Sequence, residues 1–146
     1  MFRYNIDGVL VHSSLPINGL TPLTMTDAEA KHCIGFDSKG TPIYNQVAID
    51  AEIQAVKQKQ VSAINTEFER QCSEVGVIFE GNYFQYDDTS RSRLAETKDD
   101  IRVRFWRSVD NVNVDMSNEK KNLLYKVLIE TYYTKFYEKT QVIDGV

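Results

Sequence analysis

The chain has 146 residues, the length of a single domain, with 42% hydrophobic and 26% charged residues, a composition that argues against wholesale disorder. Its net charge of −4 gives it no electrostatic reason to bind a phosphate backbone, so we expect no nucleic-acid partner. Asn5, Asp7 and Gly8 break the first apolar run, so we expect no signal peptide, and the longest apolar stretch is too short for a membrane span. Cys33 and Cys72 fit free thiols in a reducing compartment.

Residues 1–46 have the pattern of a small β-rich unit. Alternating residues 2–6 are followed by Asp7-Gly8, a strong hairpin signal, and then by a second apolar run at 9–11. The composition shifts near residues 45–48, so we expect a boundary there, with a second domain over 47–146.

A short helix is expected later in this unit, because Thr26 and Glu29 have the spacing of a capping box. Gly35 is the residue expected just beyond its C-terminus. Asp37 to Gly40 then predicts a turn between two short β segments.

From Val47 the hydrophobic period changes to that of a helix. A stripe of side chains, apolar except for Gln60, recurs every three or four residues, at Ile49, Ile53, Val56, Gln60, Ile64, Phe68 and Cys72. The pattern predicts an uninterrupted helix of roughly 25 residues, about 38 Å long, that ends near Gly76.

Two β-rich runs over 77–86 follow, and Gly81-Asn82 between them predicts the tip of a hairpin. Asp87 or Asp88 is expected to cap a polar helix through 89–99. Because Leu94 is its only strongly apolar residue, this helix is expected to be short or peripheral.

A second hairpin is expected over residues 102–114, with Asp110-Asn111 at its tip. Its Trp106 is expected to be mostly buried and to pack the hairpin against a long helix. Ser117 is a good N-cap for a last helix over 118–139.

The last helix carries two neighbouring stripes at spacings of four. The first consists of Leu124, Leu128, Tyr132 and Phe136, and the second of Tyr125, Ile129, Tyr133 and Tyr137. Together they cover more than the single stripe a surface helix needs. Either both stripes are internal, or part of the tyrosine-bearing stripe faces another chain.

Catalytic, metal and cofactor signals are weak. The only bases near neutrality are His12 and His32, and neither lies in a nucleophile motif, so a small hydrolase using His12 or Cys72 is a remote alternative. No paired Cys or His ligands have zinc spacing, and no glycine-rich phosphate loop occurs. We therefore expect no catalytic, metal-binding or cofactor-binding residues.

A cluster of arginines is the exception to the acidic composition. It comprises Arg91, Arg93, Arg102, Arg104 and Arg107. With Phe105 and Trp106 interleaved, it suits contact with nucleic acid, but solvent exposure or salt bridges to nearby acids explain it more simply. Arg104, Arg107 and Trp106 are also interface candidates, since Arg and Trp are enriched at binding hot spots.

The segment from about residue 51 to the C-terminus resembles a known domain. A long helix is followed by Phe-Glu-Gly-Asn-Tyr-Phe-Gln-Tyr-Asp at 79–87, then by Phe-Trp-Arg-Ser-Val-Asp-Asn-Val-Asn-Val-Asp-Met-Ser at 105–117, and then by a closing helix. This pattern resembles the uncharacterised C-terminal domain of tail-fibre and other tail proteins of tailed bacteriophages. The motifs consist of turn and packing residues and contain no catalytic group.

The resemblance implies a non-enzymatic virion component of the tail, baseplate or fibre-attachment region, made in the host bacterial cytoplasm. Its partners would be other tail, baseplate or fibre proteins, within a homo-oligomer or symmetric multi-copy assembly. The alternative within the phage is a tail-fibre assembly chaperone absent from the mature virion. The expected fold is α+β, a small N-terminal β unit followed by helix–hairpin–helix–hairpin–helix with two long helices.

Overall fold

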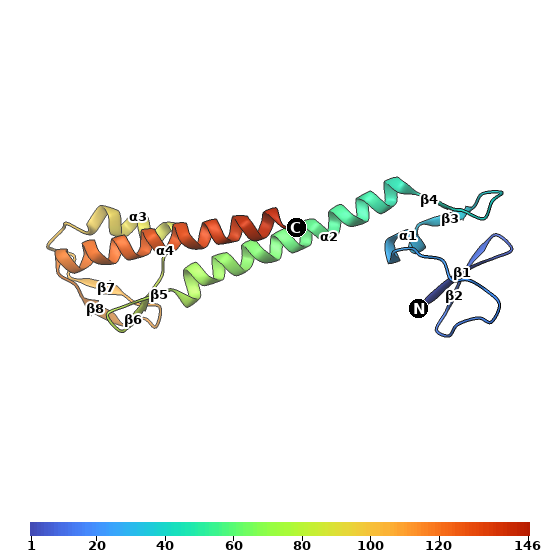
Figure 1. Cartoon of the computed structure of the whole chain (residues 1–146). Helices are drawn as coiled ribbons and strands as arrows, with labels where there is room; N and C mark the ends of the chain where they lie inside the picture. Colours follow the sequence, from blue (N-terminus) through green and yellow to red (C-terminus); the bar gives the residue numbers. More distant parts are fainter. The chain divides into compact units, whose positions relative to one another are not determined.

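The computed structural model describes all residues from 1 to 146 and confirms the α+β class (Figure 1). All strands form two-stranded antiparallel sheets. The chain divides into two compact units, Met1–Lys59 and Gln60–Val146, and the division falls inside the long helix α2 (Gln46–Arg70). The first part of α2 therefore belongs with the N-terminal unit, whereas the composition shift had suggested a boundary at the start of the helix.

The N-terminal unit begins with the expected hairpin of β1 (Phe2–Ile6) and β2 (Val9–Ser13). Asp7 and Gly8 connect the strands with φ values of 51° and 80°. Positive φ at both turn positions is typical of the tight turn that matches the twist of two antiparallel strands.

Helix α1 (Asp27–Lys31) begins at the predicted capping box. Thr26 accepts a hydrogen bond from the amide of Glu29, whose carboxylate in turn accepts from the amide of Thr26. The helix ends earlier than predicted, with His32 as its C-cap. The assignment of Gly35 to the helix end is therefore wrong: Gly35 lies in the next strand, at a register shift, with a φ of 151°.

Strands β3 (Cys33–Phe36) and β4 (Pro42–Tyr44) form the second hairpin of this unit. The hydrophobic core of the unit is small. Its buried apolar residues are Tyr4, Ala30 and Ile49.

Helix α2 continues into one π-helical turn, η1 (Gln71–Val75), and the helical stretch ends at Gly76 as expected. Gly76 has a φ of 74°, and a Cβ atom there would lie 2.6 Å from the carbonyl oxygen of Phe84. The predicted apolar stripe is buried near its ends, whereas Ile53 and Val56 in its middle are exposed. Periodicity identified the helix but did not determine which part of the stripe is covered.

The C-terminal unit continues with a hairpin of β5 (Val77–Phe79) and β6 (Asn82–Phe84). The predicted tip is wrong by one residue. The turn consists of Glu80 and Gly81, with φ values of 46° and 84°, and Asn82 pairs with Phe79. Glu80, and not the expected Asn82, is therefore the non-glycine residue of the turn, and it adopts the left-handed conformation.

Strands β7 (Phe105–Arg107) and β8 (Asn113–Asp115) form the second hairpin of the C-terminal unit. Their connection is longer than two residues, and the amide of Ser108 donates to the carbonyl of Val112 to close it. Asp110 and Asn111 lie at its tip as predicted, and Asn111 has a φ of 62°.

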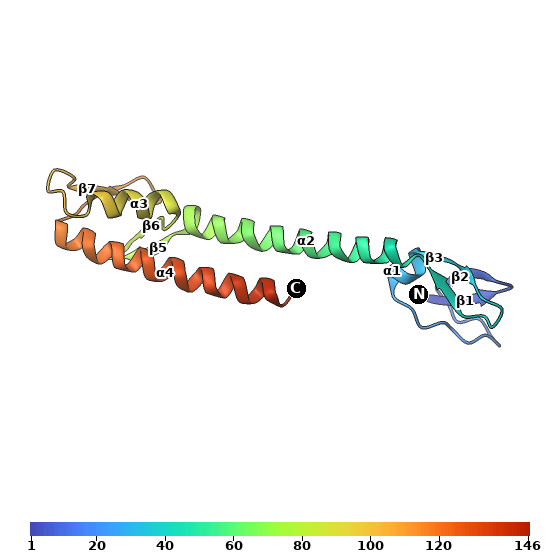
Figure 2. The same cartoon turned by 90° about the horizontal axis from the view of Figure 1, so that it is seen from above.

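Helices α3 (Asp88–Thr97) and α4 (Asn118–Asp144) have the expected N-caps, Asp87 and Ser117. In the two views α4 runs beside the C-terminal part of α2 and contacts α3 and β5 (Figures 1 and 2). Helix α3 is short, as expected, with 10 residues, and its one buried residue, Leu94, lies in the core. The buried core comprises Cys72, Phe84, Tyr86, Leu94, Met116, Leu124 and Leu128.

Candidate protein–protein interface

The two predicted stripes of α4 rotate gradually out of the core. Four residues advance a helix by about 400°, so each step of four turns a stripe about 40° further around the axis. In the second stripe, Tyr125 and Ile129 are half-buried, whereas Tyr133 and Tyr137 are 61% and 66% exposed. The structure thus places the first two of these candidates against the protein and the last two in solvent.

Four aromatic rings connect the interior of the C-terminal unit to this exposed surface. The ring centroid of Tyr132 lies 5.6 Å from that of Phe68, 5.9 Å from that of Phe136 and 5.6 Å from that of Tyr133. Phe68 also meets Phe136 edge-on at 6.2 Å. These four residues form what we call the aromatic ladder. Aromatic pairs in edge-on or offset-stacked arrangements stabilise the packing of these rings on one another.

Two cations brace the aromatic ladder. The guanidinium of Arg91 lies 3.4 Å from the ring centroid of Tyr132, and its Nε donates to the carbonyl of Tyr86 at 3.1 Å. The ammonium of Lys139 lies 4.4 Å from the ring centroid of Phe68 and 4.6 Å from that of Phe136. Cations over ring faces are attracted by the ring quadrupole. Sequence reasoning had not assigned a role to Lys139.

A groove of about 370 Å³ lies between α2 and α4 beside the ladder. Its apolar lining comes from Ala63, Ile64, Phe68 and Val142, and its rim carries Glu67, Gln71, Lys135, Glu138 and Lys139. The rim charges are largely paired within each helix, Glu67 with Arg70 and Lys135 with Glu138.

The other predicted interface residues, Arg104, Trp106 and Arg107, lie on or next to the β7–β8 hairpin and have surroundings different from those of the α4 tyrosines. Trp106 is half-buried and packs against the core, with the guanidinium of Arg93 5.8 Å from its ring centroid. Arg107 is exposed, and the guanidinium of Arg104 pairs with Asp115 at 3.4 Å. The hairpin arginines and the exposed tyrosines of α4 therefore share no ion pair, hydrogen bond or cation–π contact.

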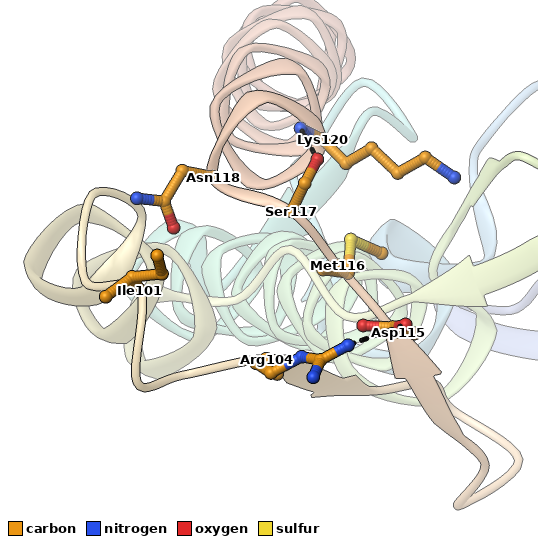
Figure 3. Close-up of a pocket in the computed structure, with 7 residues that line it drawn as sticks. All are labelled: Ile101, Arg104, Asp115, Met116, Ser117, Asn118 and Lys120. Atoms are coloured by element: carbon orange, nitrogen blue, oxygen red, sulfur yellow. Dashed lines mark hydrogen bonds and ion pairs between the residues drawn. The ribbon is translucent and has the colours of Figure 1, made fainter.

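A pocket of about 640 Å³ at the start of α4 was not predicted (Figure 3). The polar side chains around it are already paired. Arg104 points at Asp115, Ser117 accepts from the amide of Lys120, and the Lys120 ammonium pairs with Glu80 at 2.9 Å. Each charged side chain that lines the pocket is therefore in an ion pair within the chain.

The residues of the hydrolase alternative lie in different units and settings. Burial raises the pKa of the Cys72 thiol to about 11, which keeps it protonated and poorly nucleophilic at neutral pH. His12 is exposed on β2, and His32 contacts the carboxylate of Glu52 at 2.6 Å. No group of three His, Cys, Asp or Glu side chains is arranged to hold a metal ion.

Helices α2 and α4 have the length of a membrane span, but neither contains a sufficiently apolar stretch to be one. Comparison with protein-family models, with curated proteins and with solved structures gives no match to this chain. The candidate site is an aromatic surface on α4 with one exposed end.

Proposed function

We propose that the chain is a non-enzymatic assembly component that acts through protein–protein contacts on α4. The observation that carries this proposal is the exposure of two tyrosines on α4: Tyr133, at the exposed end of the aromatic ladder, and Tyr137, one helical turn further along. More than half of each residue's surface lies in solvent. Tyrosine is enriched at binding hot spots because it combines a large apolar ring with a polar end.

The setting of this assembly is proposed to be a bacteriophage tail, baseplate or fibre-attachment region. The support for this setting is the resemblance of the two hairpin motifs, at 79–87 and 105–117, to the tail-protein domain. In the structure these motifs form the β5–β6 and β7–β8 hairpins, and β5 contacts α4. An assembly chaperone that leaves before maturation would use the same surface.

The experiment is mass spectrometry of purified particles of the phage that encodes the chain. A structural component is expected in the particles at fixed stoichiometry, whereas a chaperone is expected in infected cells but not in particles. Absence of the chain from both particles and assembly intermediates would contradict the proposal.

A substitution experiment tests the surface itself. The double variant Tyr133→Ser, Tyr137→Ser is expected to keep its circular dichroism spectrum and to lose incorporation, since hot-spot tyrosines commonly contribute about 2 kcal/mol or more each. Tyr83→Ser is the matched control, because Tyr83 is also an exposed tyrosine but lies on β6. Normal incorporation of the folded double variant would show that the partner binds elsewhere.

A further inference from the structure

We infer that the partner of the α4 surface is a second copy of this chain, bound through α4 in antiparallel orientation about a two-fold axis level with Leu128. This inference rests on the proposed function, because it names the occupant of the same surface. It follows from the chemistry of one helix face, which we call the outer face of α4. The outer face consists of Glu119, Leu123, Lys126, Glu130, Tyr133 and Tyr137.

These residues share one face because they recur at alternating spacings of four and three. The outer face is opposite to Leu124 and Leu128, which are fully buried in the core. All six of its side chains are exposed, with Leu123 at 48%. No other element of the C-terminal unit lies on the side of α4 that faces away from α2 and α3 (Figure 2).

The outer face is complementary to itself only when two copies run in opposite directions. A two-fold axis level with Leu128 places Lys126 of one copy opposite Glu130 of the other, and Leu123 opposite Tyr133. The same symmetry brings Glu119 opposite Tyr137, whose hydroxyl is a donor for a carboxylate. Each pair occurs twice, as in any isologous contact.

The charges in the centre determine the orientation. Lys126 and Glu130 form no ion pair within the chain, so both are free for a partner. In a parallel pair at the same level, Lys126 would face Lys126 and Glu130 would face Glu130. Like charges in contact disfavour that arrangement and opposite charges favour the antiparallel one.

A charge-swap experiment on the full chain tests the register. Sedimentation equilibrium of the wild type across the micromolar range is expected to give a monomer–dimer equilibrium. Lys126→Glu and Glu130→Lys are each expected to weaken dimerisation at least tenfold, because each places like charges together. The double variant with both substitutions restores opposite charges and is expected to recover most of the wild-type affinity.

Disulfide trapping tests the orientation in a background of Cys33→Ser and Cys72→Ala. The variant Leu123→Cys, Tyr133→Cys is expected to form a covalent dimer on oxidation, with peptide mapping showing the 123–133 linkage between chains. Lys98→Cys, at the end of α3, is the control and is expected to remain monomeric.

Several outcomes would overturn the inference. They are a monomeric or trimeric wild type, single charge variants that dimerise normally, a double variant no better than either single one, or a linkage that joins identical positions. A monomeric chain whose incorporation into particles still requires Tyr133 and Tyr137 would refute the self-pairing and leave the proposed function intact. A chain that dimerises in the stated register but is absent from particles and assembly intermediates would refute the proposed function and leave the self-pairing intact.

Discussion

The ammonium of Lys121 on α4 donates a hydrogen bond to the carbonyl oxygen of Thr97, the last residue of α3, at 2.9 Å. A second bond goes to the carbonyl of Asp100 at 2.6 Å, and the Lys121 side chain is fully buried. The last carbonyls of a helix have no partner within the helix and carry partial negative charge. Lys121 therefore caps α3 from a different helix and couples the positions of the two.

Replacing Lys121 with methionine tests this cap. Met keeps most of the side-chain volume but leaves two carbonyl oxygens without this donor, so we expect the free energy of unfolding to fall by about 1–3 kcal/mol. Urea unfolding followed by Trp106 fluorescence measures the change. Lys120→Met is the control: its partly exposed ion pair with Glu80 predicts a change below about 1 kcal/mol. Equal losses in the two variants would contradict a special role for Lys121.

Gly76 is expected to be intolerant of any side chain. Its φ of 74° disfavours other residues, and a Cβ atom would approach the Phe84 carbonyl oxygen to 2.6 Å and the Val109 side chain to 2.8 Å. Gly76→Ala should therefore lower the free energy of unfolding by more than about 2 kcal/mol. Gly81 has a similar φ of 84° but nothing within 4 Å, so Gly81→Ala should cost only the backbone strain of about 1 kcal/mol. Thermal unfolding of the two variants separates the steric effect from the conformational one.

Stability is expected to fall at alkaline pH because of two buried groups. Burial raises the pKa of Cys72 from 9.0 to about 11 and that of Tyr86 from 10.0 to about 12. Both groups are neutral when protonated, so the folded state binds their protons more tightly than the unfolded state does. The contribution of the two protonated groups to the free energy of unfolding is complete below about pH 9, and it is lost as the pH rises toward 12.

Chemical unfolding of the wild type and of Cys72→Ala at a series of pH values measures this effect. The wild type should lose on the order of 2 kcal/mol from the thiol alone between about pH 9 and about pH 11. The variant starts from a lower stability, because a core atom is missing, but its stability should depend less steeply on pH. Identical slopes would show that other groups cause any alkaline loss.

The contribution of Arg91 to stability is expected to depend on the planar shape of its guanidinium group. It stacks 3.4 Å from the Tyr132 ring centroid, donates to the Tyr86 carbonyl and pairs with Asp88, with a side chain only 12% exposed. Lysine keeps the charge but not the planar fork, so Arg91→Lys should cost about 1–2 kcal/mol.

Arg102→Lys provides the comparison for Arg91→Lys. Arg102 also pairs with an aspartate, Asp100, but its side chain is 86% exposed. Its replacement should change stability by less than about 0.5 kcal/mol in the same thermal unfolding assay. A loss at Arg102 as large as that at Arg91 would indicate that the forked hydrogen bonds to an aspartate, and not stacking on an aromatic ring, are the important interaction.

Local chemistry in the sequence determined most of the secondary structure. The capping box at Thr26, the N-caps Asp87 and Ser117 and the turn at Asp7-Gly8 lie where predicted, because each depends on residues only a few positions apart. The one-residue error at Glu80-Gly81 arose because glutamate adopts the left-handed conformation there. Strand pairing, which a local propensity scale does not contain, determines that turn.

Tertiary packing decided which apolar and charged side chains are buried. Leu94 is in the core because α3 packs on α4, and Lys121 is buried because the end of α3 supplies carbonyl acceptors for its ammonium. Conversely, Tyr133 is exposed because a spacing of four carries its stripe about 40° further from the core at each step. The sequence alone determined that α4 has two apolar stripes. Only the packing of other elements on one side of α4 decided where each stripe leaves the core, because burial depends on contacts between residues distant in the chain.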